Sequence, residues 1–220
     1  MSSTDPQVND VSFAPVTAPH GWWNLCSFSE TPPGYGLAVE GWKDMLGRVA
    51  QGERIRVEWR GTVKQDLQQM FVESFLGANS VKTLSLWTPG SAHGPLFPAE
   101  DLPENFLPNL STIEPDTMDS LIKLVPGRPV HTVRLGYKGI SWDSIDPVVE
   151  ALKQSTSNIE HLQIEITGAP DKEQIAKTFE KIVAEFTNLV TLQWECRPGE
   201  TKNMHFVKVT TCFASAQVTA

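Results

Sequence analysis

The sequence has few cysteines and no long hydrophobic run. These two features argue against a disulfide-rich protein and against a membrane-spanning protein. Cys26, Cys196 and Cys212 are an odd, scattered set, which predicts reduced thiols rather than a disulfide framework. No run of 18 apolar residues occurs, so there is no candidate transmembrane helix. The start, MSSTDPQVND, has neither the basic residues nor the apolar stretch of a signal peptide. We therefore expect an intracellular protein, cytoplasmic or nuclear, with no membrane partner.

Basic residues are also scarce. The chain has 18 Lys and Arg against 26 Asp and Glu, which gives a net charge of −8. An acidic chain without a basic cluster is poorly suited to a phosphate backbone, so we predict no nucleic-acid partner. The composition, 40% hydrophobic and 20% charged, is that of a globular protein. Its 220 residues suffice for one large domain or two small ones.

Signatures of catalysis are missing as well. The five histidines have no metal-ligand spacing to each other or to a cysteine. The sequence contains no phosphate-binding glycine loop and no Gly-x-Ser-x-Gly elbow. Asp143 and Asp146 flank a predicted helix start, where the helix dipole favours carboxylates, so capping explains them better than acid–base catalysis. The sequence thus predicts no catalytic residue, no metal and no cofactor.

What the sequence does contain is a repeat. SNIEHLQIE at 157–165 and TNLVTLQWE at 187–195 share one pattern and begin 30 residues apart. The central apolar residue of this pattern recurs every 20 to 30 residues, at Val57, Leu84, Ile113, Val133, Leu162 and Leu192. Each of these residues is the centre of a short predicted strand.

Helical patterns fill most of the intervals between these strands. Apolar side chains with i, i+3, i+4, i+7 spacing predict helices at residues 64–78, 118–125, 142–154 and 171–187. Residues 88–105 instead contain four prolines, which predicts an irregular loop. The chain therefore alternates strands with helices, one unit after another.

Two architectures fit such strand–helix units, which bury their apolar faces by stacking on one another. In a doubly wound sheet the strands are covered on both faces and are apolar throughout. Here Leu84 and Leu86 are apolar whereas Thr83 and Ser85 are polar, so one face is open to water. We predict an α/β fold, a leucine-rich-repeat (ribonuclease-inhibitor-like) arc of short parallel strands with outer helices. The doubly wound sheet is the alternative.

The ends of the chain differ from the repeats. We predict an N-terminal capping segment at 1–50, repeat units at 51–195, and a C-terminal cap or truncated repeat at 196–220. Trp22 and Trp23 either cap the first repeat or form a binding patch. Residues 205–213 either fold back as a cap or added strand, or the chain is a fragment of a longer arc.

The segments LPNL at 107–110 and LVPGRPV at 124–130 resemble the repeats of fungal, basidiomycete-type F-box/leucine-rich-repeat-like proteins. The resemblance extends over about residues 64–195. It implies a protein-binding arc; in F-box members an N-terminal F-box also recruits a cullin-type ubiquitin ligase. Residues 1–50 contain one helical candidate, Val39–Val49, and no F-box pattern, so no cullin-ligase adaptor is predicted.

The polar strand positions are predicted to line the concave face in columns. These columns contain Thr83, Thr112, Thr132, His161 and Thr191; then Ser85, Glu114, Arg134, Gln163 and Gln193; then Trp87, Gly136, Glu165 and Glu195. They form either a partner surface or a solvated sheet face. As partner-binding residues we select Trp87, Arg134, His161, Gln163, Glu165, Gln193 and Glu195. Trp87 and Arg134 are the anchoring types among them, and Glu165 with Glu195 forms an acidic end.

Three arginines, Arg54, Arg56 and Arg60, alternate with apolar residues in what we predict to be the first strand. They either contact an acidic partner or form a solvated edge.

The leading functional hypothesis is a non-catalytic protein–protein interaction module, of the substrate-receptor kind. The alternatives are a small enzyme or ligand-binding protein with its site at the strand carboxyl ends, and a truncated product without a function of its own. Sequential strand order favours the arc, and a reversal of order favours the enzyme.

Overall fold

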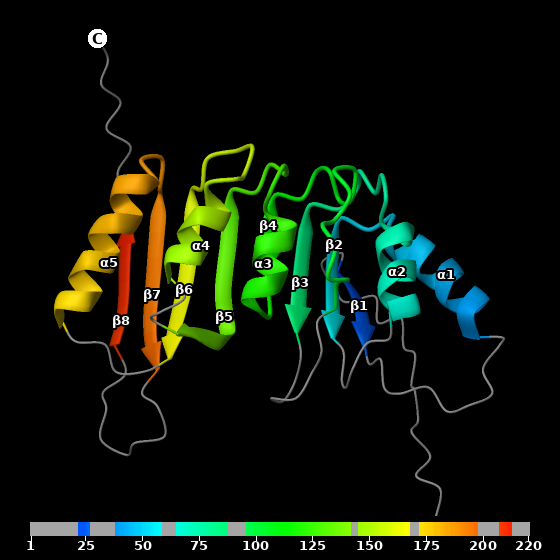
Figure 1. Ribbon diagram of the computed structural model, residues 1–220, viewed down its shortest axis with the longest axis horizontal. Coiled ribbons are helices and arrows are strands. Elements are labelled where there is room, and N and C mark those ends of the chain that lie inside the picture. Colours follow the sequence, from blue (N-terminus) through cyan, green and yellow to red (C-terminus); the bar gives the residue numbers. More distant parts are fainter. Residues whose placement is uncertain are drawn as a thin grey trace, which may run out of the picture.

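The computed structural model describes residues 22–26, 38–58, 65–87, 96–141, 145–167, 172–197 and 207–212. They form one eight-stranded sheet and a layer of helices (Figure 1). In chain order the elements are β1 (Trp22–Cys26), α1 (Ala38–Val49), β2 (Arg54–Glu58), α2 (Gln65–Ser74), β3 (Thr83–Trp87), β4 (Thr112–Glu114), α3 (Met118–Leu124), β5 (Thr132–Ser141), α4 (Ile145–Leu152), β6 (His161–Thr167), α5 (Lys172–Glu185), β7 (Thr191–Arg197) and β8 (Val207–Cys212).

The strands lie in the sheet in the same order as in the sequence, from β1 to β8. Strands β1 to β7 are parallel, and β8 runs antiparallel to β7. The arrowheads in Figure 1 show this change of direction at β8. The chain is therefore an α/β protein. Its described strands show no reversal of order and so none of the crevices at which doubly wound sheets bind ligands.

The helices cover one face of the sheet. Each parallel connection moves one strand further in the same direction, and because such crossovers are right-handed, their helices all fall on the same side. In Figure 1, α3, α4 and α5 lie in front of the strands, and α2 and α1 continue the row of helices beyond β1. Helix α1 contacts α2, and α4 contacts both α3 and α5. No helix in the described part of the chain lies on the opposite face of the sheet.

The connection from β3 to β4 has no helix in its described part, residues 96–111. It fills the gap in the helical layer with buried apolar side chains instead. Phe97 and Phe106 are both 1% exposed or less, and their ring centroids lie 5.9 Å apart. Phe71 of α2 packs against both rings, at 6.0 and 6.4 Å. The predicted irregular loop is thus confirmed over residues 96–105, and it is part of the core.

The core lies between the helices and one face of the sheet. Alternate residues of each strand enter it, such as Leu84 and Leu86 of β3, which are 0% and 3% exposed. The helices contribute the apolar faces that their spacing predicted, including Met70, Phe71, Phe75, Val149, Leu152 and Ile182. The apolar side chains that recur every two residues in the strands and every 3.6 residues in the helices therefore pack against each other in a single core layer.

The two ends of the sheet differ in part from the prediction. Strand β2 is not the first strand, because β1 pairs with it in parallel from Trp22↔Arg54 to Cys26↔Glu58. Together β1 and α1 form one more strand–helix unit at this end of the sheet, next to the first predicted repeat. At the other end, β8 is the added strand that was one alternative for residues 205–213.

Candidate functional site

The strand register aligns polar residues across the face that bears no helix. The first residues of successive strands pair to form what we call the first polar row: Arg54, Thr83, Thr112, Thr132, His161 and Thr191. Two positions later runs the second polar row: Arg56, Ser85, Glu114, Arg134, Gln163 and Gln193. The rows align the residues of the first two predicted columns and add Arg54 and Arg56, because side chains alternate with a period of two on a strand.

A hollow of about 530 Å³ lies over these rows. Its lining consists of Arg54, Thr83, Thr112, Thr132, Val133, Arg134, His161, Leu162, Gln163, Thr191 and Gln193. Apart from two aliphatic residues, these side chains carry hydroxyl, amide, imidazole or guanidinium groups. No carboxylate lines the hollow within the described part of the chain. The lining therefore offers groups that both donate and accept hydrogen bonds, together with two guanidinium groups that only donate.

Two histidines lie within hydrogen-bond distance of hydroxyl groups, and His161 is the one that lines the hollow. Nδ1 of His161 lies 2.8 Å from Oγ1 of Thr191, across the β6–β7 pair. Nδ1 of His131 lies 3.0 Å from Oγ1 of the adjacent Thr132. Within the described residues, Nε2 of His161 has no hydrogen-bond partner. His161 is thus fixed through one ring nitrogen and can offer the other to a ligand.

The two arginines that line the hollow differ in their pairing. Nη1 of Arg134 donates to Oε1 of Glu114 at 2.7 Å, and both side chains keep contact with solvent. Such a pair contributes little stability, so a ligand can replace it at small cost. Arg54 is exposed, and its guanidinium has no hydrogen bond or ion pair with any residue that the structure describes. Among the described residues that line the hollow, Arg54 is therefore the cation without a partner.

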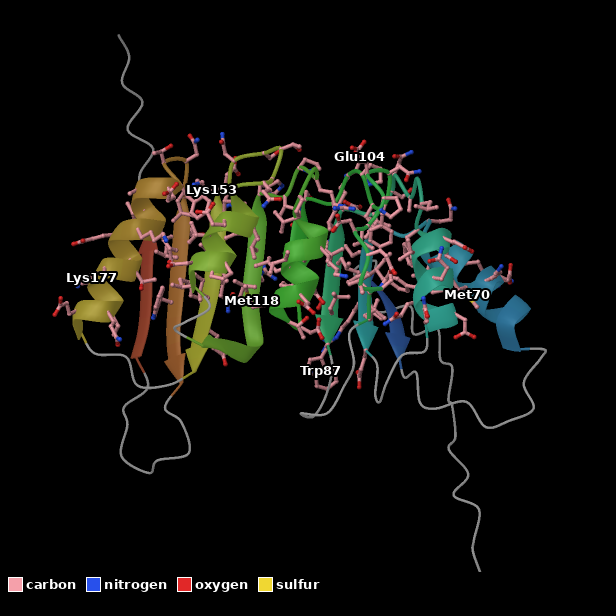
Figure 2. The ribbon with its side chains drawn as sticks, in the orientation of Figure 1. Met70, Trp87, Glu104, Met118, Lys153 and Lys177 are labelled. Atoms are coloured by element: carbon pink, nitrogen blue, oxygen red, sulfur yellow. The ribbon has the colours of Figure 1, made fainter. Side chains whose placement is uncertain are left out.

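The third predicted column departs from the prediction. Trp87, at the carboxyl end of β3 (Figure 2), does not line the hollow; Cζ of Arg56 lies 5.3 Å from the centroid of its ring, as in a cation–π contact. Glu165 is only 3% exposed, so it forms no acidic surface. The β5–β6 register shifts after Leu135, and Gly136 therefore does not pair with Glu165. The side chain of Glu195 lies outside the described part.

Arg54 lines the hollow although it stands outside the predicted columns. Its alternation with Ile55 and Val57 predicts the correct face of the strand. Of the two predicted alternatives for this strand, the edge position is excluded, because β1 pairs with the outer side of β2. Arg54 therefore lies on an inner strand, between β1 and β3, and borders the hollow. Arg60, the third arginine of that pattern, lies outside the described residues.

Other candidate chemistry is weak. Among the described residues, no group of three or more His, Cys, Asp or Glu side chains is placed to hold a metal ion. Oδ1 of Asp146, in the first turn of α4, accepts from Nζ of Lys181 at 2.6 Å, and Asp143 lies outside the described residues. No described helix is long and apolar enough to cross a membrane.

Comparison of the chain with protein-family models, with curated proteins and with solved structures finds no match. The case for a function therefore rests on the one-sided sheet and on the hollow over its polar rows.

Proposed function

We propose that the protein is a non-catalytic protein–protein interaction module, built as a leucine-rich-repeat arc, and that the helix-free face of its sheet is the binding surface. The observation that carries this proposal is the one-sided sheet. Seven parallel strands follow in sequence order, the helices cover one face, and a hollow of about 530 Å³ lies on the other. Stacked strand–helix units use such continuous open faces to bind partners.

The chemistry of the face supports a macromolecular partner more than a small ligand. The hollow extends over six strands, from β2 to β7, and all but two of its lining residues are of polar types. Small-molecule sites are mostly apolar cavities that enclose their ligand. An elongated polar surface on rigid strands instead suits a partner that makes many hydrogen bonds along its length.

The resemblance to fungal F-box/leucine-rich-repeat-like proteins supports the same proposal. The residues that carry the resemblance are core residues: Leu107, Leu110, Leu124, Val125 and Val130 are all 0% exposed. The similarity therefore lies in the packing of the repeat, as expected of a shared scaffold with variable surface residues. A role as a substrate receptor fits this class. The proposal includes no cullin-ligase adaptor, because that role requires an F-box and the sequence contains no such pattern.

The test is a pull-down from an extract of the native cells, read by mass spectrometry. Three baits are compared: the wild type, an Arg134→Glu/Gln163→Ala variant of the hollow, and an Arg48→Glu control. Arg48 is exposed on α1 and takes the same charge change on the helical side. Circular dichroism verifies that all three baits are folded.

We expect a partner that the wild type and the control recover and the hollow variant loses. Equal recovery by all three baits, or no specific protein with the wild type, overturns the proposal.

A further inference from the structure

We infer that the hollow receives an extended, acidic segment of the partner protein, with its carboxylates directed at Arg54 and at the donors of the first polar row. This inference rests on the proposed function and specifies the chemistry of the partner. Four observations carry it: the local charge, the unpaired donors, the length of the row and the small number of cations.

The charge of the hollow is opposite to that of the chain. The whole protein has a net charge of −8, yet the described residues that line the hollow include two arginines, one of them paired with Glu114, and no carboxylate. Among the described residues, the nearest carboxylate in the polar rows is that of Glu114, which pairs with Arg134 and does not itself line the hollow. A positive site on a negative protein attracts an anionic segment locally while the rest of the surface repels other acidic molecules.

Several donors in the hollow lack partners within the described part of the chain. Besides Arg54, these are the hydroxyls of Thr83 and Thr112 and the side-chain amide of Gln163, none of which makes a hydrogen bond to a described residue. A carboxylate accepts hydrogen bonds from guanidinium, hydroxyl and amide groups, and those from a charged donor are the strongest. An acidic side chain therefore satisfies this set of groups better than a basic or apolar one.

The length of the first polar row indicates how long the segment is. From β2 to β7 there are five steps between neighbouring strands, and at about 4.8 Å each they span about 24 Å. An extended chain advances about 3.3 Å per residue, so about seven residues cross the hollow. Every second side chain of such a bound segment faces the sheet. If those side chains are acidic, they contact the first polar row along its whole length.

The small number of cations argues against nucleic acid as the occupant. Binding to a phosphate backbone depends on several cations that each neutralise one phosphate. The lining has one arginine free of described partners, and a second that is already paired with Glu114. One free cation and a row of hydroxyls match a short peptide with a few carboxylates.

The experiment measures fluorescence polarisation of two labelled peptides, hepta-glutamate and hepta-glutamine, with the purified full-length chain. We expect hepta-glutamate to bind at least about tenfold more tightly. The Arg54→Gln variant weakens its binding about tenfold, which corresponds to about 1.4 kcal/mol. The Arg48→Gln control, which removes an exposed arginine from α1, leaves the affinity unchanged. Because solvent-exposed charges are screened, raising the salt from about 50 to about 500 mM also weakens binding.

Equal affinity for the two peptides, or an unchanged affinity in Arg54→Gln, overturns the inference. So does a single-stranded oligonucleotide that binds as tightly as hepta-glutamate with the same dependence on Arg54. If the pull-down finds a partner that the hollow variant loses but hepta-glutamate does not bind, the inference fails and the proposed function stands. If the extract yields no partner, the proposed function fails and the inference fails with it.

Discussion

Replacement of Arg128 tests how the irregular unit between β3 and β5 is held together. Arg128 follows α3 and is 2% exposed, and no described carboxylate pairs with it. Its guanidinium donates to the backbone carbonyls of Pro103, Phe106, Lys123, Leu124 and Pro126. The shortest of these bonds, to Phe106 and Pro126, measure 2.7 and 2.8 Å. Arg128 therefore joins the loop at 96–111 to the carboxyl end of α3.

We expect replacement of Arg128 to lower the free energy of unfolding strongly, because the backbone carbonyls that it binds would remain buried without a hydrogen-bond donor. Burial lowers the pKa of Arg128, since desolvation disfavours the charged form, and the carbonyl oxygens compensate for that cost. A hydrogen bond to a charged group contributes about 1.5–3 kcal/mol, and two well-formed ones are lost in Arg128→Met. The carbonyls that remain lack a donor. With the desolvation cost of the guanidinium subtracted, we expect the free energy of unfolding to fall by about 3 kcal/mol.

Urea unfolding followed by circular dichroism measures this change. In Arg128→Ala the loss rises to about 4 kcal/mol, because the aliphatic stem is removed too and leaves a cavity. Arg128→Lys falls between Met and wild type, since a lysine keeps the charge but lacks the planar fork that reaches several carbonyls at once. The melting temperature of Arg128→Met drops by about 6–12 °C for a chain of this length.

The matched control is Arg48→Met. That side chain is 73% exposed, and its ion pair with Asp44 lies on the surface of α1. We expect its stability to stay within about 0.5 kcal/mol of the wild type. The reasoning is refuted if Arg128→Met is as stable as Arg48→Met, because the carbonyl contacts would then contribute nothing.

Three further predictions follow from local geometry. Gly127 has φ +72°, so Gly127→Ala lowers the free energy of unfolding by about 1 kcal/mol through backbone strain, measured by urea unfolding; an unchanged midpoint contradicts this. Thr117 caps α3, and Thr117→Ala costs about 1 kcal/mol, while Thr117→Ser retains most of the stability. The pKa of Lys153 is raised by its hydrogen bond to Glu185 and by the charges around it. Because the folded pKa lies above the unfolded value, this stabilisation is present below about pH 10.4 and is lost as the pH rises through the folded pKa. The stability difference between wild type and Lys153→Met therefore shrinks from pH 8 to pH 11, and an unchanged difference contradicts it.

Much of the candidate site could be predicted from the sequence because strands have a strict period of two. Thr83, Thr112 and Thr132 occupy equivalent places in successive repeats, and the register brings them into one row. Arg134 and Gln163 align in the same way. A repeat length near 30 residues was enough to place neighbouring strands side by side, since each unit stacks on the one before it.

Other features depend on contacts that no local pattern records. The pairing of β1 with β2 joins Trp22 to Arg54, and the segment WWNLC shares no pattern with the repeats. Glu165 and Gln163 occupy alternate positions of the same strand and look equivalent in the sequence. In the structure, however, Glu165 is buried and Gln163 is half-buried. Arg128 is buried because its guanidinium lies between the loop at 96–111 and the carboxyl end of α3, which are not adjacent in the sequence.

The sequence by itself determined the alternation of strands with helices, the faces they bury and the polar columns, because these depend on side-chain spacing along a few turns or one strand. The tertiary structure decided the place of β1 beside β2, the antiparallel direction of β8 and which of the described polar residues line the hollow. These properties depend on contacts between residues far apart in the chain. They are therefore fixed only when the strands pair with one another in the folded sheet.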